Sequence, residues 1–133
     1  MKLKRDLFFK LYKVMNEIDS KQYNKYFLKS ISFNKKQLKE MIEDINLKSS
    51  VIYTEKYFNL KRDFEQVTSE EQAKYLSESN KEYIEEIGKK EKEFVDYVSE
   101  EIEIELETIK FEHVPEMIHS DVYNTLEILF EKK

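Results

Sequence analysis

Two histidines and a glutamate give this chain its clearest metal-ligand spacing. His113, Glu116 and His119 follow one another at intervals of three residues, and imidazole and carboxylate groups are typical ligands of zinc. Steps of three residues place the two histidines about 240° apart on a continuous helix, and Pro115 interrupts any such helix. The pattern therefore favours two surface histidines near a turn, and we expect neither a metal nor another cofactor.

The other residue types that carry out catalysis do not fall into catalytic patterns. The chain has no cysteine, one glycine and one proline, which excludes thiolate chemistry, Cys-based zinc sites and Gly-rich phosphate loops. Ser120 is the one serine beside a histidine, and neighbours in sequence are a poor guide to a catalytic pair. The carboxylates are too numerous for one acid–base pair to stand out. The sequence predicts a protein that is not an enzyme.

Opposite charges are concentrated in the two halves of the chain. Residues 1–62 carry 15 Lys or Arg and 7 Asp or Glu, whereas residues 63–133 carry 8 and 21. The formal net charge of −5 therefore conceals a basic half and an acidic half. Such segments can pair within one fold, pair between subunits, or each face a separate partner.

The elements that must position these charges are predicted to be long helices. The length of 133 residues fits a single domain, 1–133. One glycine and one proline leave almost no turn chemistry. Apolar periodicity predicts helices over about 7–18, 22–65 with a bend near Ser49 and Ser50, 69–100, and 120–131. We expect a mostly α, coiled-coil-like fold in which the two longest arms form an antiparallel hairpin and short helices cap one end.

Local signals mark where three of these elements begin or end. Ser69 with Gln72, or Thr68 with Glu71, fits a capping box at the start of the second arm. The polar run 77–80 predicts a further break in that arm. His119, Ser120 and Asp121 are candidate caps of the last helix.

A strictly alternating segment predicts a small β pair. Residues 101–107 alternate glutamate with Ile102, Ile104 and Leu106, as half-buried strands do. A helix with Ile102, Leu106 and Ile109 on one side is the alternative, and we favour the strand because β-branched residues suit it. The expected partner is residues 1–5, whose lysines would face the glutamates and join the two chain ends.

Two charged helix faces are the candidate binding surfaces. The basic face consists of Lys21, Lys25, Lys29, Lys36 and Lys39. The acidic face consists of Glu82, Glu86, Glu93, Asp96 and Glu100. Aromatic residues accompany the basic face, which would suit single-stranded nucleic acid, whereas a row of carboxylates can imitate a phosphate backbone and bind a basic protein. Charged rows are also usual on solvated helix faces, and this alternative stays open.

Two segments of the chain resemble a known group of proteins. Residues 26–38 (YFLKSISFNKKQL) resemble the start of the long helix in small helical bacteriophage proteins of unassigned function. Residues 101–109 (EIEIELETI) and Val114-Pro115-Glu116 resemble the acidic strand of those proteins and the turn before their last short helix. The resemblance implies a phage or prophage origin and a non-enzymatic helical protein, and it brings no catalytic residues.

The leading functional interpretation is a non-enzymatic protein-binding module that acts through the acidic face, with inhibition of a host defence or nucleic-acid-handling protein as its expected role. One alternative is an oligomer that sequesters a nucleotide-like small molecule between subunits. A further alternative is a single-strand nucleic-acid binder that uses the basic aromatic face. We also expect a homo-oligomer, because each helix has a narrow apolar stripe. Since no signal peptide or membrane span is recognisable, we expect a cytoplasmic protein without membrane contact.

Overall fold

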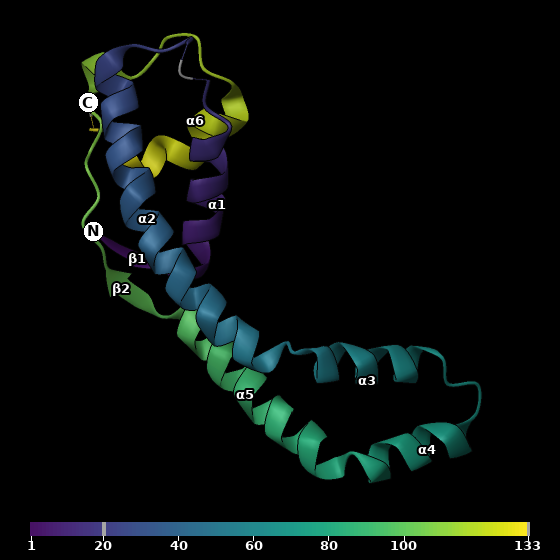
Figure 1. Ribbon diagram of the computed structural model, residues 1–133. Helices are drawn as coiled ribbons and strands as arrows, with labels where there is room; N and C mark the ends of the chain where they lie inside the picture. The colour runs from purple at the N-terminus through teal and green to yellow at the C-terminus, as the bar shows by residue number, and fades with distance from the viewer. Residues whose placement is uncertain (20, 133) are drawn as a thin grey trace. The chain divides into compact units, whose positions relative to one another are not determined.

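Six α-helices and one two-stranded sheet form the part of the chain that the computed structural model describes, residues 1–19 and 21–132 (Figure 1). In chain order the elements are β1 (Lys2–Lys4), α1 (Asp6–Asn16), α2 (Lys25–Ile52), α3 (Glu55–Glu65), α4 (Glu70–Ser79), α5 (Lys81–Ser99), β2 (Glu101–Glu103) and α6 (Ser120–Leu126), with 3-10 turns at Phe111–His113 and Glu127–Leu129. The predicted mostly α fold with a small β pair is confirmed. Among the described residues, no helix combines the length and the apolar character needed to cross a membrane.

The elements belong to two compact units. Unit 1 is Met1–Glu43 with Ser99–Lys133, and unit 2 is Asp44–Val98. Each unit is described by itself below. The single domain expected from the chain length stays a prediction.

The long helix expected over 22–65 is two helices. Helix α2 ends at Ile52, three residues after the predicted bend begins, and α3 starts at Glu55. Thr54 has an extended backbone, and its hydroxyl accepts a hydrogen bond from the Tyr57 N–H at 3.4 Å. This cap satisfies a free N–H group in the first turn of α3, so a new helix begins here and α2 does not continue.

The second arm starts and breaks where the sequence predicted. The Ser69 hydroxyl accepts a hydrogen bond from the Gln72 N–H at 3.2 Å, and the Gln72 side chain accepts one from the Thr68 N–H at 3.0 Å. This confirms a reciprocal cap at the start of α4. Asn80 then separates α4 from α5, and its side-chain amide donates to the Leu76 carbonyl at 3.0 Å.

The sheet of unit 1 joins the N-terminal strand to the segment that directly follows α5. Strands β1 and β2 are antiparallel, with Lys2 opposite Glu103, Leu3 opposite Ile102 and Lys4 opposite Glu101. Leu3 is buried beneath the pair, with only 4% of its surface exposed. The predicted pairing, with lysines facing glutamates, is therefore confirmed. The regular ladder ends at Glu103, so the strand is shorter than the 101–107 expected.

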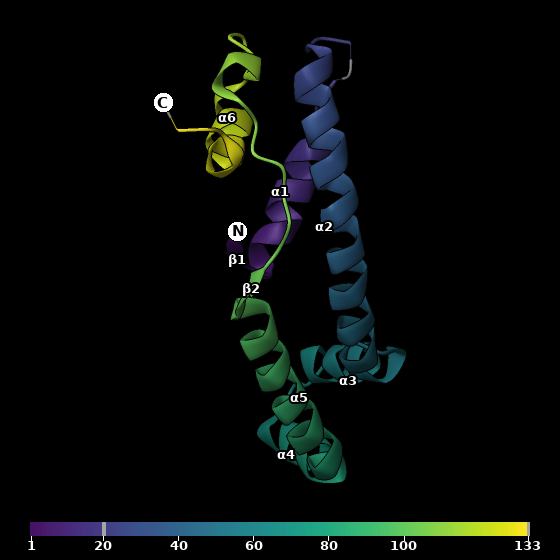
Figure 2. The same ribbon diagram turned by 90° about the vertical axis from the view of Figure 1, so that its left-hand side faces the viewer.

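After β2 the chain continues as an extended segment that three parts of unit 1 hold in place (Figure 2). At its start, the Ile104 N–H donates to the Met1 carbonyl at 2.9 Å. In its middle, the buried Asn34 side chain of α2 donates to the Glu107 carbonyl at 2.9 Å and accepts from the Glu107 N–H. At its end, Ile109 donates to the Leu129 carbonyl at 2.8 Å and pairs in parallel with Phe130. The alternative helix through Ile109 is not formed.

The core of unit 1 lies between these segments and the helices. Its most deeply buried apolar side chains are Phe8, Leu11, Met15, Phe27, Leu38, Ile109, Leu126 and Leu129. Helix α6 packs against α1. The predicted cap of α6 is confirmed, because the His119 Nδ1 accepts a hydrogen bond from the Asp121 N–H at 3.2 Å. The helix is shorter than the 120–131 expected, since the chain tightens into a 3-10 turn after Leu126.

Unit 2 has a thinner core than unit 1. The last turns of α2 run antiparallel to α5, as the hairpin prediction required (Figure 1). The buried apolar residues described within unit 2 are Ile45, Ile52 and Ile87, and α3 and α4 contribute none. Few buried apolar residues mean that packing stabilises this unit only modestly.

One buried polar atom of unit 2 gives a testable stability effect. The Tyr83 hydroxyl is buried and has no hydrogen-bond partner among the described residues, while the Lys56 ammonium lies 4.2 Å from the centre of the ring. Tyr83→Phe should raise the free energy of unfolding by about 1 kcal/mol, because it removes an unsatisfied hydroxyl and keeps the ring. Urea denaturation measures this change. Tyr75→Phe is the control, since Tyr75 is exposed, and an equal effect of both substitutions would contradict the expectation.

The β pair of unit 1 should also respond to acid. The N-terminal ammonium donates a hydrogen bond to Glu103 at 2.6 Å, and this bond and its charge lower the pKa of that carboxyl from 4.5. A carboxyl with a lowered pKa stabilises the fold above its ordinary pKa and loses that contribution as the pH falls through the folded-state pKa. In urea denaturation, wild type should exceed Glu103→Gln in stability at neutral pH and match it in acid. Glu105→Gln, at an exposed position, should show no such pH dependence.

Candidate functional site

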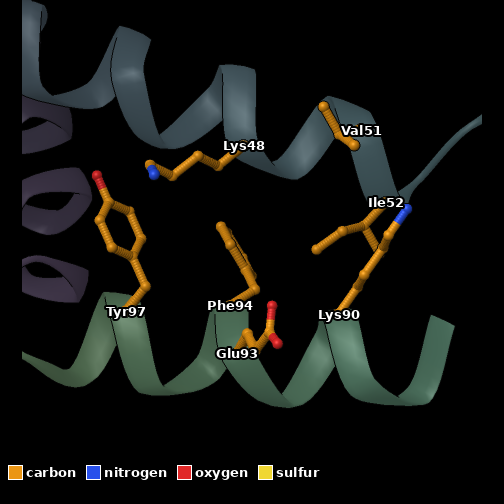
Figure 3. Close-up of a pocket in the computed structure, with 7 residues that line it drawn as sticks. All are labelled: Lys48, Val51, Ile52, Lys90, Glu93, Phe94 and Tyr97. Carbon is orange, nitrogen blue, oxygen red and sulfur yellow. The ribbon is translucent and has the colours of Figure 1, made fainter. Parts of the chain in front are cut away.

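A groove lies between α2 and α5 on the surface of unit 2 (Figure 3). Its volume is about 320 Å³. The lining residues are Lys48, Val51 and Ile52 from α2, and Lys90, Glu93, Phe94 and Tyr97 from α5. In Figure 3 the Phe94 ring stands between the two helices, with Tyr97 toward one end of the groove and Ile52 toward the other. The groove therefore has an apolar floor with charged groups around it.

Polar contacts hold one end of the groove in place. The Tyr97 hydroxyl donates a hydrogen bond to the Asp44 carboxylate. The Lys48 ammonium lies 4.5 Å from the centre of the Tyr97 ring, within cation–π range. Because Tyr97 is fixed from both sides, this end of the groove is formed before any ligand binds.

Apolar side chains around the groove remain exposed. Leu47 and Val51 are one helical turn apart on α2 and are 68% and 62% exposed. Elsewhere in unit 2, Val95 of α5 and Phe58 of α3 are also 57% and 50% exposed. Adjacent exposed apolar groups on a unit with few buried ones mark a surface that another apolar surface can cover.

Four of the five residues predicted for the acidic face lie on one exposed side of α5. Glu82, Glu86, Glu93 and Asp96 are all exposed and are called the acidic row below. Glu93 also lines the groove, so the acidic row and the groove are continuous. Glu86 pairs with Lys90 at 3.0 Å, which partly neutralises the middle of the row. The fifth residue, Glu100, belongs to unit 1, where it pairs with Arg5 at 3.2 Å.

Four of the five residues predicted for the basic face lie on α2 within unit 1. Lys25, Lys29, Lys36 and Lys39 are exposed and are called the basic row below. None of them forms an ion pair with a described residue of unit 1. The fifth, Lys21, lies before α2 in a turn in which its N–H donates to Asp19 at 2.9 Å.

An aromatic stack lies beside the basic row. The rings of Tyr26 and His113 are 4.8 Å apart and nearly parallel, and the Lys25 ammonium lies 5.2 Å from the centre of the Tyr26 ring. Tyr26 is exposed, whereas His113 is partly covered. His113 is thus engaged in a stack, and His119 caps α6. Within residues 1–19 and 21–132, no three His, Asp or Glu residues gather as metal ligands would.

Sequence reasoning missed Asn34 and the groove. Asn34 falls at helical spacing between Phe27, Ile31 and Leu38, so a polar residue in an apolar stripe was the available signal. The pKa of Tyr53 in unit 2 is raised by burial and, to a smaller extent, by the charge of Glu91. Its hydroxyl therefore stays protonated at neutral pH and can donate a hydrogen bond.

Comparison of the chain with protein-family models, with curated proteins and with solved structures finds no match. Function must therefore be inferred from the surfaces themselves. The groove and the acidic row together can accept a partner that presents apolar side chains flanked by positive charge. The basic row and its aromatic stack can accept negative charge.

Proposed function

We propose that the protein is a non-enzymatic protein-binding module that docks a basic, amphipathic segment of another protein on α2 and α5 of unit 2. The observation that carries the proposal is the continuity of the apolar groove with the acidic row through Glu93. An amphipathic helix binds by placing its apolar face in a groove. Its basic residues would then lie along Glu82, Glu86 and Asp96.

The energetics of unit 2 support this proposal. Leu47 and Val51 remain in water although they flank a groove. Covering each such side chain stabilises a complex by about 1.5–3 kcal/mol when burial is complete. The carboxylates contribute mainly to the association rate and to the choice of a basic partner. Because the chain resembles small phage proteins, we expect the partner to be a host protein with a basic surface.

Neutralising the acidic row tests the proposal. A variant with Glu82, Glu86 and Glu93 changed to Gln and Asp96 to Asn keeps the groove but removes four charges. The control changes Glu17, Glu65, Glu105 and Glu116 to Gln, which removes four exposed charges elsewhere. In affinity capture from a host lysate, a protein retained by wild type and by the control should be lost by the acidic-row variant. Retention of the same proteins by all three would contradict the proposal.

A second variant tests the apolar part of the same surface. Val51→Asp should weaken capture at least about tenfold, because it places a charge at the mouth of a groove that an apolar side chain would cover. It should leave stability nearly unchanged, since Val51 is exposed. Binding of the purified captured protein, measured by calorimetry, gives the size of the effect. Unchanged affinity would show that the groove takes no part in binding.

Single-strand nucleic-acid binding is the second candidate function, and the Tyr26–His113 stack beside the basic row favours it. Exposed aromatic rings stack on bases, and lysines neutralise phosphates. Tyr26→Ala should then reduce the affinity for a labelled oligonucleotide, and the affinity should fall steeply with salt. The nucleotide-sequestering alternative needs a site between subunits and stays a prediction.

A further inference from the structure

The basic row and the acidic row have the same spacing along their helices. Lys25, Lys29, Lys36 and Lys39 are separated by four, seven and three residues, and so are Glu82, Glu86, Glu93 and Asp96. Each acidic residue thus stands 57 positions after one lysine. All eight side chains are exposed. Two helices laid side by side in parallel would therefore place one lysine opposite each carboxylate.

The residues in the gaps of the two rows contribute one neutral contact and one like-charged contact. The seven-residue gap of the basic row exposes Ser32 and Phe33, and the equivalent gap of the acidic row contains Lys89 and Lys90. In the same parallel alignment Lys89 lies opposite the neutral Ser32. Lys35 and Lys92, which also stand 57 positions apart and lie at the edges of the rows, are one like-charged pair against the four opposite-charged pairs.

The geometry of the helices makes both rows usable as contact surfaces. Spacings of three, four and seven residues keep side chains within a stripe about 80° wide on an α-helix. A row that spans 14 residue steps extends about 20 Å. This is long enough for four pairs and narrow enough for one helix to contact all of them.

We propose that a second copy of this chain occupies the acidic row, with the basic row of each subunit lying parallel to the acidic row of the other. Every molecule carries both rows, so identical chains can supply both sides of the contact. The lysines of the basic row have no ion pair with a described residue of their own unit, and their side chains are exposed to a partner. This inference goes beyond the proposed function because it needs no foreign protein.

The dimer would also regulate the surface proposed above. Its contact covers the acidic row, so a foreign basic partner must displace the second subunit. Exposed ion pairs are individually weak and are screened by salt. The dimer is therefore expected to be of modest affinity, and its dissociation constant should rise about tenfold or more between about 50 mM and about 300 mM salt.

A charge-swap pair tests the inference. One full-length variant carries glutamate in place of Lys25, Lys29, Lys36 and Lys39, and the other carries lysine in place of Glu82, Glu86, Glu93 and Asp96. Each variant has two rows of the same sign, so each alone should be monomeric by sedimentation velocity at low salt. An equimolar mixture should form a dimer again, because each row then meets its opposite. Circular dichroism verifies that both variants are helical.

A control pair separates matched rows from overall charge. It carries glutamate at Lys10, Lys13, Lys61 and Lys74, and lysine at Glu17, Glu65, Glu105 and Glu116, all of which are exposed and lie outside the rows. These variants have the same net charges as the swap pair, and each alone should dimerise like wild type.

Several results would overturn the inference. These are a wild-type monomer at high micromolar concentration in low salt, a dimer that survives in either swap variant, or a mixture of the two that stays monomeric. A monomeric wild type that still loses its captured protein in the acidic-row variant would overturn the dimer and leave the proposed function. A charge-dependent dimer, together with unchanged lysate capture by the acidic-row variant, would support the dimer and overturn the proposed function.

Discussion

Asn34→Asp should lower the free energy of unfolding by about 3 kcal/mol, within the range measured when a buried hydrogen-bonded group is lost. The Asn34 side chain is fully buried and meets both backbone groups of Glu107, donating to its carbonyl at 2.9 Å and accepting from its N–H. An aspartate at this position replaces the donor by an acceptor that repels the carbonyl, and it places a charge in the interior. The middle of the extended segment would lose its attachment to α2.

The matched control is Asn46→Asp, the same substitution at an exposed position of the same helix. It should change stability by no more than about 0.5 kcal/mol, as surface substitutions usually do. Urea denaturation followed by circular dichroism measures both variants. If the two substitutions cost the same, Asn34 does not hold the segment in solution.

Deleting residues 2–4 should cost about 3–5 kcal/mol, because it removes the whole of β1 and the buried Leu3 side chain. The deletion also leaves β2 without its partner strand and uncovers Ile102, which lies opposite Leu3 in the pair. An unpaired strand edge is a template for association between molecules. We therefore expect a lower denaturation midpoint together with increased light scattering on warming.

The control for this deletion keeps the strand and removes only its charges. Lys2→Gln with Lys4→Gln should cost less than about 1 kcal/mol, because exposed ion pairs contribute little. A truncated protein as stable and as soluble as the full chain would show that the two chain ends do not pair in solution.

Sequence patterns predicted the elements of this fold where the determining signal was local or periodic. The alternation of residues 101–107, set against the lysines of residues 1–5, predicted both the β pair and which charges would face each other. Ser69 and Gln72 predicted the start of α4, because a cap is encoded within four residues. The restart of the chain at Thr54 was missed, since no glycine or proline marks it and it depends on one hydroxyl.

Some features of the candidate site could be predicted from the sequence and others could not, for the same reason. The charged rows could be predicted because a helix converts sequence spacing directly into position on a face. The groove could not, because it depends on how α2 and α5 of unit 2 approach each other. The contact of Asn34 with Glu107 spans 73 positions in the sequence, and no local pattern encodes such a separation. The position of Asn34 in an apolar stripe indicated that its side chain forms a hydrogen bond inside the protein. It did not indicate that the partner is Glu107.

The extended segment of unit 1 has a consequence for how the protein is made. Its far end is held by Leu129 and Glu131, whose backbone groups bond to Ile109 at 2.8 Å. Because these residues follow unit 2 in the chain, unit 1 cannot close its final backbone contacts until unit 2 has been synthesised. Unit 2 is one uninterrupted stretch, Asp44–Val98, and local contacts form fastest. Its helices can therefore assemble on the nascent chain while the first 43 residues still lack their partner strand, which leaves the apolar side chains of those residues open to chaperones until Ser99–Lys133 has been synthesised.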